Sequence, residues 1–264
     1  MIHKTAIIDS KAKISNNVSI GAYSIIGADV VIGEGSIIQS HVNIIGDTII
    51  GKNNKIYSFS SIGNDPQDLK YKNEKTKIII GDNNKIREYV TVNPGTLGGG
   101  KVTTIGNNCL FMVHSHIAHD CKIGNNVILA NSVPIGGHAT IEDEVIIGGN
   151  SAVQQFTRVG KLSMIGGMCG VVKDVLPYSL VYGNRSILQG VNIIGLRRKN
   201  IPNNKINKVK EAFDFIFQNK HHMDNVNKLP NEISKEKIVK DIIDFLNNDK
   251  KRPICTPLSL DENN

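Results

Sequence analysis

The stretch AIIDSKAKISNNVSIGAYSIIGADVVIGEGSIIQSHVNIIG, residues 6–46, places an isoleucine at every sixth position from Ile8 to Ile44. The count runs on to Ile62, resumes over residues 80–92, and after a one-residue slip continues from Ile105 to Val171. A small residue follows most of these anchors by four positions, and glycine often follows directly, where a bend would crowd a side chain. A fixed short period predicts a solenoid of stacked, equivalent layers.

A period of six matches neither the 3.6-residue repeat of a helix nor the two-residue repeat of an ordinary strand. It fits a parallel β-helix with three short strands per turn, which gives about 18 residues per coil. The expected fold class is therefore mainly β, a left-handed parallel β-helix, an exception to the usual right-handed crossover. Composition agrees, because tryptophan is absent and aromatic residues make up only 5% of the chain, as narrow coils require.

Two segments interrupt the count and divide the chain. Residues 63–79 and 94–104 are too polar for a coil and are expected to loop out of a β-helix that spans residues 1–190. Loops that leave a rigid scaffold are common places for function. Beyond Val171 the pattern fades, and residues 191–264 are predicted to form a small α-helical C-terminal domain.

Within that domain, apolar residues recur at helical spacing over about 203–219 and again over 234–248, with Ser234 as a plausible N-cap. Residues 249–264 are expected to be a loosely held tail. The chain carries a net charge of +7, and its basic residues thicken here: Arg197, Arg198, Lys199, Lys205, Lys208 and Lys210. This clustering favours an acidic partner, with solvated helix faces as the alternative, and no module typical of nucleic-acid binding accompanies it.

Several classes of protein are disfavoured by the sequence. No apolar run approaches a membrane span, and the first residues lack the basic end and long apolar stretch of a signal peptide, so we expect a cytoplasmic protein without an integral membrane segment. Cys109, Cys121 and Cys169 occupy the small inward position of the repeat and are predicted to be buried packing residues. Together with Cys255 they show neither metal-ligand spacing nor a disulfide framework.

Candidate chemistry concentrates in HSHIAHD, residues 114–120, whose three histidines fall off the buried positions of the repeat. Residues 18 apart should stack in adjacent coils, about 4.8 Å from each other. This places His119 beside Gly137 and His138 of the next coil. Gln154 and Gln155 follow them one coil later. Imidazole suits a general base near neutral pH, Asp120 could orient it, and an exposed glycine amide could hold an oxyanion.

The motifs HIAHDC (116–121), PQDLKY (66–71), GGH (136–138) and GVNIIGLRRK (190–199) resemble those of the UDP-N-acetylglucosamine O-acyltransferase family of hexapeptide-repeat proteins. The resemblance covers nearly the whole chain, including both loops. It implies transfer of an (R)-3-hydroxyacyl group from acyl carrier protein to the 3-hydroxyl of UDP-N-acetylglucosamine, the first step of lipid A biosynthesis. It also implies a homotrimer with sites between subunits, no cofactor, no metal and no covalent acyl-enzyme.

By this resemblance His119 is the general base, Asp120 supports it, and the Gly137 amide stabilises the tetrahedral oxyanion. The strip and the resemblance together assign substrate binding to Gln67, Asp68, Lys70, His116, His138, Gln154, Gln155, Gly167, Asn192 and Arg198. We expect Lys70 to help complete a neighbouring subunit's site, and Gly167 to lie on the acyl channel. An acidic carrier protein would give the basic helical domain its partner.

Two residues depart from the family pattern, because many members carry histidine where this chain has Asn93 and Gln154. A 3-amino analogue of the sugar is therefore an alternative acceptor. A metal-dependent β-helix enzyme of the γ-carbonic anhydrase type is a remote alternative: His114 and His119 echo its spacing, but residues 76–80 lack the third histidine. A purely structural β-helix would explain the repeat but neither the loops nor the histidines.

Overall fold

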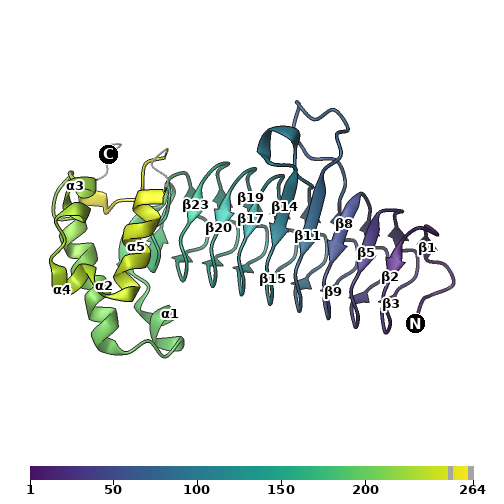
Figure 1. Ribbon diagram of the computed structural model, residues 1–264, viewed down its shortest axis with the longest axis horizontal. Coiled ribbons are helices and arrows are strands. Elements are labelled where there is room, and N and C mark those ends of the chain that lie inside the picture. The colour runs from purple at the N-terminus through teal and green to yellow at the C-terminus, as the bar shows by residue number, and fades with distance from the viewer. Residues whose placement is uncertain (249–251, 261–264) are drawn as a thin grey trace.

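The computed structural model describes residues 1–248 and 252–260. It is an elongated left-handed parallel β-helix with a cluster of helices at its C-terminal end, as expected (Figure 1). The chain visits three sheets in turn, and each coil hydrogen-bonds to the coils before and after it. Outside the loops the register is 18 residues up to β25 (Gly170–Val171), as in the pairs Ile7↔Ile25 and Ile128↔Ile146. In the last coil it shortens to 16 residues, as in the pair Met164↔Leu180.

The three sheets are named in chain order. Sheet 1 consists of β1 (Ile7–Ile8), β4 (Ile25–Ile26), β7 (Asn43–Ile44), β10 (Ser61–Ile62), β13 (Thr91–Val92), β16 (His116–Ile117), β19 (Pro134–Ile135), β22 (Ala152–Val153) and β25 (Gly170–Val171). Sheet 2 consists of β2 (Lys13–Ile14), β5 (Val30–Ile32), β8 (Asp47–Ile50), β11 (Lys77–Ile80), β14 (Val102–Ile105), β17 (Lys122–Ile123), β20 (Thr140–Ile141) and β23 (Arg158–Val159). Sheet 3 consists of β3 (Ser19–Ile20), β6 (Ile37–Ile38), β9 (Lys55–Ile56), β12 (Lys85–Ile86), β15 (Leu110–Phe111), β18 (Ile128–Leu129), β21 (Ile146–Ile147), β24 (Met164–Ile165), β26 (Ser179–Tyr182) and β27 (Ile187–Val191). We call the turns between consecutive sheets edge 1–2, edge 2–3 and edge 3–1.

The sixfold repeat is the core of the β-helix. Each strand ends on its anchor, and the anchors from Ile20 to Val171 point inward and are buried. The glycine after an anchor allows the coils to stack, because a Cβ on Gly21 would lie 2.5 Å from the backbone nitrogen of Ser40. The four cysteines are free thiols and all are buried, as predicted for the three on the repeat.

Both loops leave the coil, and both are shorter than the sequence suggested. The first covers residues 63–76, because residues 77–79 already belong to β11 and pair with β8 and β14. The second covers residues 93–101 and contains a 3₁₀ turn, η1 (Leu97–Gly99), because residues 102–104 belong to β14. The two loops project together from one side of the β-helix (Figure 1).

The helical region follows an antiparallel hairpin of β26 and β27. It comprises α1 (Ile193–Arg198), α2 (Asn203–Ile216), α3 (His222–Asn227), α4 (Asn231–Ser234), α5 (Lys237–Asn248) and a 3₁₀ turn, η2 (Leu258–Leu260). The helical pattern over 203–219 is confirmed by α2. The assignment of Ser234 as an N-cap is wrong, because Ser234 ends α4 and the amides of Val239 and Lys240 bond to the carbonyl of Glu236.

The C-terminal segment also differs from the expectation of a loosely held tail. Residues 249–251 and 261–264 lie outside the described residues, but residues 252–260 pack against the β-helix. Ile254 forms a bridge with Asp174, and Ile254 and Cys255 are buried. Asp174 also pairs with Arg158 (Nε to Oδ2, 2.8 Å), whose Nη1 donates to the carbonyl of Phe245 in α5.

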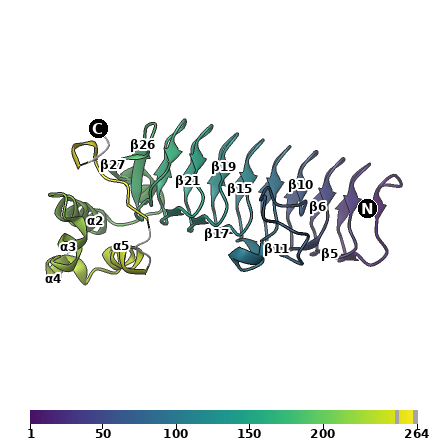
Figure 2. The ribbon, with the colours of Figure 1, turned by 90° about the horizontal axis from the view of Figure 1, so that it is seen from above.

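The two ends of the β-helix are closed differently. The helices cover the C-terminal end (Figures 1 and 2). At the N-terminal end Ile2 and Ile7 are 51% and 65% exposed, and the anchors Ile8 and Ile14 are only half-buried. The first coils therefore have stacking partners on one side only.

Candidate active site

His119 and Asp120 stand on edge 1–2, in the turn between β16 and β17. Asp120 has a positive φ of 59°, which a short polar side chain tolerates and which turns the chain sharply between the two sheets. Nδ1 of His119 lies 2.9 Å from Oδ2 of Asp120. The His119 side chain is 12% exposed and that of Asp120 is wholly buried. With an ionised carboxylate on Nδ1, the imidazole carries its proton there and presents Nε2 as a proton acceptor.

The second loop holds the buried carboxylate of Asp120. The backbone nitrogen of Thr96 donates to both carboxylate oxygens, at 2.9 and 3.0 Å, and its hydroxyl donates to Oδ2 at 2.6 Å. The backbone nitrogen of Asp120 donates to the hydroxyl of Thr103 at 2.8 Å. Sequence reasoning missed both threonines. Thr96 lies in a loop that has left the repeat, whereas Thr103 belongs to β14, whose 18-residue register with β17 could have indicated it.

Gly137 lies directly against the ring of His119, as the 18-residue stacking predicted. A Cβ at this position would be 2.7 Å from Cε1 and Nε2 of His119. Its backbone N–H donates to no acceptor among the residues described, whereas the next amide, of His138, donates to the carbonyl of His119. An unused backbone donor therefore lies beside a candidate general base, the arrangement an oxyanion requires.

The other histidines of the strip are close by. His138 stands edge-on to His119 with ring centroids 4.9 Å apart, and stacks on Phe156 at 4.3 Å. Burial lowers the pKa of His138, with His119 adding to that effect while Asp120 and Asp68 oppose it. Burial also lowers the pKa of His116, whose Nδ1 lies 2.6 Å from the hydroxyl of Thr91. The desolvation of both rings favours neutral imidazoles that can exchange hydrogen bonds with a polar ligand.

The first loop reaches the same strip. Asp68 is near enough to His138 to raise its pKa, and the Asp68 carboxylate accepts from the backbone nitrogen of Lys70 at 3.0 Å. Gln67 and Lys70 are exposed on this loop. The expectation that Lys70 helps to complete a neighbouring subunit's site stays a prediction.

Gln154 and Gln155 occupy the next coil of edge 1–2 and are exposed, as predicted. The returning C-terminal segment contacts both, through Arg252. Its Nη2 donates to Oε1 of Gln154 at 2.9 Å, and its Nη1 donates to the carbonyl of Gln155 at 3.2 Å. No pattern in the sequence indicates this contact, which joins residues 97 and 98 positions apart.

Three of the predicted substrate-binding residues lie on other edges. Gly167 is on edge 3–1, between β24 and β25. Asn192 caps α1 by accepting from the amide of Gly195 at 3.0 Å, and donates to the Leu162 carbonyl on edge 2–3 at 2.8 Å. Arg198 ends α1 and is exposed. A single chain does not bring these residues to His119.

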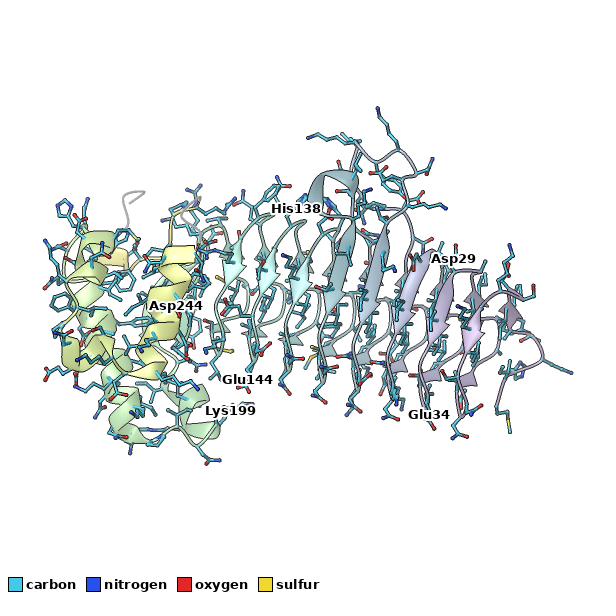
Figure 3. All side chains as sticks on the ribbon, viewed as in Figure 1. Asp29, Glu34, His138, Glu144, Lys199 and Asp244 are labelled. Atoms are coloured by element: carbon cyan, nitrogen blue, oxygen red, sulfur yellow. The ribbon has the colours of Figure 1, made fainter. Side chains whose placement is uncertain are left out.

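The side-chain view makes this separation visible. His138 lies on the edge from which the loops project, whereas Glu144 and Lys199 lie on the opposite edge (Figure 3). Nζ of Lys199 is 3.1 Å from Oε1 of Glu144, which ties the end of α1 to edge 2–3.

Asn93, one of the two departures from the family pattern, anchors the first loop. Its side-chain nitrogen donates to the carbonyls of Asn64 and Asp65 at 3.1 and 3.2 Å, and the residue is 5% exposed. Its role in this structure is thus to hold the start of the first loop.

The basic residues of the helical region are partly neutralised. Lys205 pairs with Glu236, and Lys208 with Glu211 at 2.7 Å. Within residues 1–248 and 252–260, Arg197, Arg198 and Lys210 make no ion pair. These three cations are available to an acidic partner.

A metal ion could be offered ligands by His119, Asp120 and His138, whose ligand atoms lie within 4.8 Å of one another. The carboxylate oxygens of Asp120, however, already accept hydrogen bonds from Thr96 and His119. Asp120 and His119 thus form a hydrogen-bonded dyad, with Nε2 of His138 3.9 Å from Oδ2 of Asp120.

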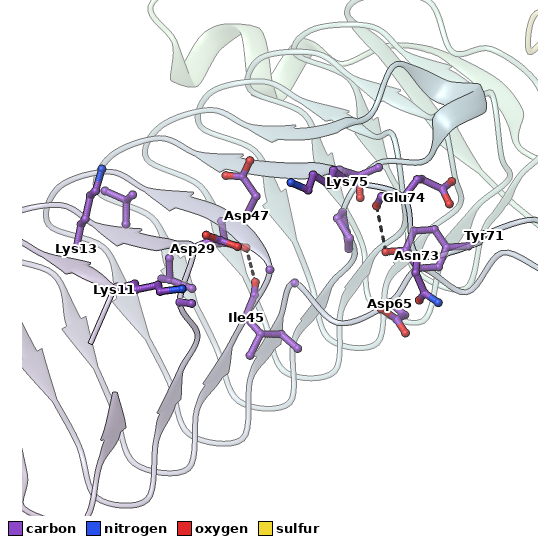
Figure 4. A pocket seen from close by; sticks show the side chains of 18 residues that line it. Lys11, Lys13, Asp29, Ile45, Asp47, Asp65, Tyr71, Asn73, Glu74 and Lys75 are labelled. Atoms are coloured by element: carbon purple, nitrogen blue, oxygen red, sulfur yellow. Dashed lines mark hydrogen bonds between the residues drawn. The ribbon is translucent and has the colours of Figure 1, made fainter. Parts of the chain in front are cut away.

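A separate groove lies away from the histidines. A groove of about 730 Å³ opens between the first loop and the N-terminal coils of sheet 2, with Lys11, Lys13, Asp29, Asp47 and Tyr71 among its lining residues (Figure 4). It contains none of the predicted site residues. None of the helices described has the length and hydropathy that crossing a bilayer requires.

Comparison with known proteins agrees along the whole chain. Residues 174–255 match the family model described as UDP N-acetylglucosamine O-acyltransferase, domain 2, and residues 11–46 and 103–137 match bacterial transferase hexapeptide repeats. An acyl-[acyl-carrier-protein]–UDP-N-acetylglucosamine O-acyltransferase from Aliarcobacter butzleri is 47% identical over 95% of this chain and 96% of its own, and one from Rickettsia canadensis is 49% identical over 96% and 97%. The crystal structure of the Francisella novicida UDP-N-acetylglucosamine acyltransferase has a TM-score of 0.93 at 37% identity, covering 99% of this chain and 97% of that one. With its repeat, its two loops and its histidine strip all in place, the chain belongs to the UDP-N-acetylglucosamine O-acyltransferase family.

Proposed function

We propose that this protein transfers an (R)-3-hydroxyacyl group from acyl carrier protein to the 3-hydroxyl of UDP-N-acetylglucosamine, the first step of lipid A biosynthesis. The observation that carries the proposal is the His119–Asp120 dyad lying against the unused amide of Gly137. Family membership supplies the identity of the two substrates.

The geometry accounts for each step of such a transfer. Nε2 of His119 takes the proton of the sugar hydroxyl as its oxygen attacks the thioester carbon, and Asp120 stabilises the imidazolium that forms. The carbonyl oxygen becomes an oxyanion that the Gly137 N–H can hold. Collapse forms the ester, breaks the C–S bond, and the imidazolium returns its proton to the departing thiolate. No covalent acyl-enzyme is needed.

Asn192, Arg198 and Gly167 support a site shared between chains, and we propose that the active assembly is a homotrimer. These residues stand on edges 2–3 and 3–1, whereas His119 stands on edge 1–2. A nucleotide bound by Arg198 and an acyl chain running past Gly167 can reach His119 only if Arg198 and Gly167 belong to a neighbouring copy of the chain. An arginine at that position suits the diphosphate.

Acyl carrier protein is the proposed donor partner, docking on the unpaired cations Arg197, Arg198 and Lys210. Because exposed charges are screened over about 8 Å at physiological ionic strength, turnover with the carrier protein should fall as salt rises. Turnover with a short acyl-pantetheine donor should not. We expect the protein to act in the cytoplasm, and its four buried, unbridged thiols suit a reducing compartment.

The decisive experiment offers the purified protein a mixture of (R)-3-hydroxyacyl and unsubstituted acyl carrier proteins with UDP-N-acetylglucosamine and its 3-amino analogue, and identifies products by mass spectrometry. An O-linked 3-hydroxyacyl product supports the proposal, and an exclusive amide product would replace the acceptor. The His119→Ala variant should lose about 2–4 orders of magnitude in rate without losing its assembly. Retention of more than about a tenth of the activity would remove His119 as the base.

A further inference from the structure

We propose that Thr96 is a positioning residue for the acyl transfer, fixing the Asp120 carboxylate so that His119 keeps the orientation and tautomer of a general base. The catalytic role of Thr96 rests on the proposed function, whereas its contact with Asp120 rests on the geometry of the second loop.

Thr96 supplies most of the hydrogen bonds that the buried carboxylate receives. The backbone N–H of Thr96 donates to both carboxylate oxygens of Asp120. The Thr96 hydroxyl donates to Oδ2, the same oxygen that faces Nδ1 of His119. Thr96 is itself 4% exposed, so water does not compete for these bonds. A buried carboxylate without such donors would favour its protonated form, which could no longer accept the His119 N–H.

The loop can approach Asp120 this closely only because it carries glycine at position 99, where a Cβ would lie 2.0 Å from Cγ of Asp120. Gly98, in the same 3₁₀ turn, faces open space, with nothing within 4 Å of its Cβ position. Contact with the carboxylate, and not the turn itself, therefore requires the glycine at position 99. Gly95 has a different neighbour, because a Cβ there would lie 2.1 Å from the backbone nitrogen of Val102.

The test compares Thr96→Val, which removes only the hydroxyl, with Thr96→Ser, which restores it. The matched control is Thr104→Val, a half-buried threonine of β14 that does not contact Asp120. Thr96→Val should lower kcat about 10- to 100-fold, the worth of a hydrogen bond to a charged group, with KM for the UDP-sugar unchanged. Thr96→Ser should recover most of kcat, and Thr104→Val should match the wild type.

If Thr96→Val does not fold, Gly99→Ala and Gly98→Ala take its place, and only the first should lower kcat. A normal kcat for Thr96→Val, a loss that serine does not rescue, or equal effects of the two alanine variants would overturn the proposal. The ring N–H resonance of His119 separates this inference from the proposed function. If the wild type transfers no acyl group, the proposed function fails. The role of Thr96 is still upheld if the Nδ1 proton of His119 is protected from solvent exchange in the wild type and loses that protection in Thr96→Val. Equal protection of this proton in both proteins refutes the role of Thr96.

Discussion

Replacing Gly137 with alanine should displace the imidazole of His119 while leaving the backbone N–H of residue 137 in place. The added Cβ would lie 2.7 Å from Cε1 and Nε2 of the ring, whereas ordinary contact begins at 3.4 Å, so the ring must retreat by about 0.7 Å. The bond from Nδ1 to Asp120, now 2.9 Å, limits that movement. A misplacement of this size at a reacting group costs about 10- to 100-fold, so kcat should fall by that factor.

The assay measures kcat and KM for both substrates in Gly137→Ala and in Gly170→Ala. Gly170 is the matched control, because nothing lies within 4 Å of its Cβ position and its φ is not left-handed. Unchanged values for Gly170→Ala combined with a loss confined to kcat for Gly137→Ala are expected. A Gly137→Ala enzyme with more than about half of the wild-type kcat would refute the reasoning, because it would mean that the His119 ring can accommodate the added Cβ without being displaced.

Four further results are expected. Gly167→Met should shift preference towards shorter acyl chains with KM for the UDP-sugar unchanged, and an unaltered chain-length profile would make Gly167 an ordinary turn glycine. Mixed assemblies of His119→Ala and Arg198→Ala chains should regain activity, because some sites draw both intact residues from different copies. His119→Ala mixed with Lys70→Ala should regain activity for the same reason, and a mixture that stays inactive would place that residue in the same chain's site as His119. Burial lowers the pKa of His116 below its ordinary value of 6.5, so in acid the unfolded chain binds more protons than the folded one and the melting temperature should fall as the pH falls. His116→Gln should make the melting temperature less dependent on pH, and an equal dependence in both proteins would exclude His116 as the cause. Exhaustive chelation should leave kcat unchanged, and a loss restored by zinc would favour the metal-dependent alternative.

The repeat predicted the fold because the β-helix makes each buried anchor equivalent to the last. The same arithmetic correctly stacked His119, Gly137 and Gln155, since edge 1–2 keeps its 18-residue register there. It failed wherever the chain leaves the coil. Thr96 reaches Asp120 from a loop with no register, and Arg252 reaches Gln154 after the whole helical region.

The misassigned cap at Ser234 has a local cause. Serine is a good N-cap in isolation, but Pro230 starts a helical turn four residues earlier, and Ser234 falls at the end of that turn. The tail expected at 249–264 rests on the general looseness of chain ends. Short segments such as Ile254 and Cys255 can be buried without a periodicity that a sequence would display.

The unequal closure of the two ends gives the β-helix a direction for local opening. Because each coil is stabilised mainly by its neighbours, transient fraying should start at the exposed isoleucines of the first coils and move inward one coil at a time. His119 lies in the turn that leads into β17, and β17 lies well inside the stack, towards the end that the helices cover (Figure 1). The coils that open locally are thus separated from the coils that carry the dyad. The coils around His119 and Asp120 should stay folded while the N-terminal coils open and close.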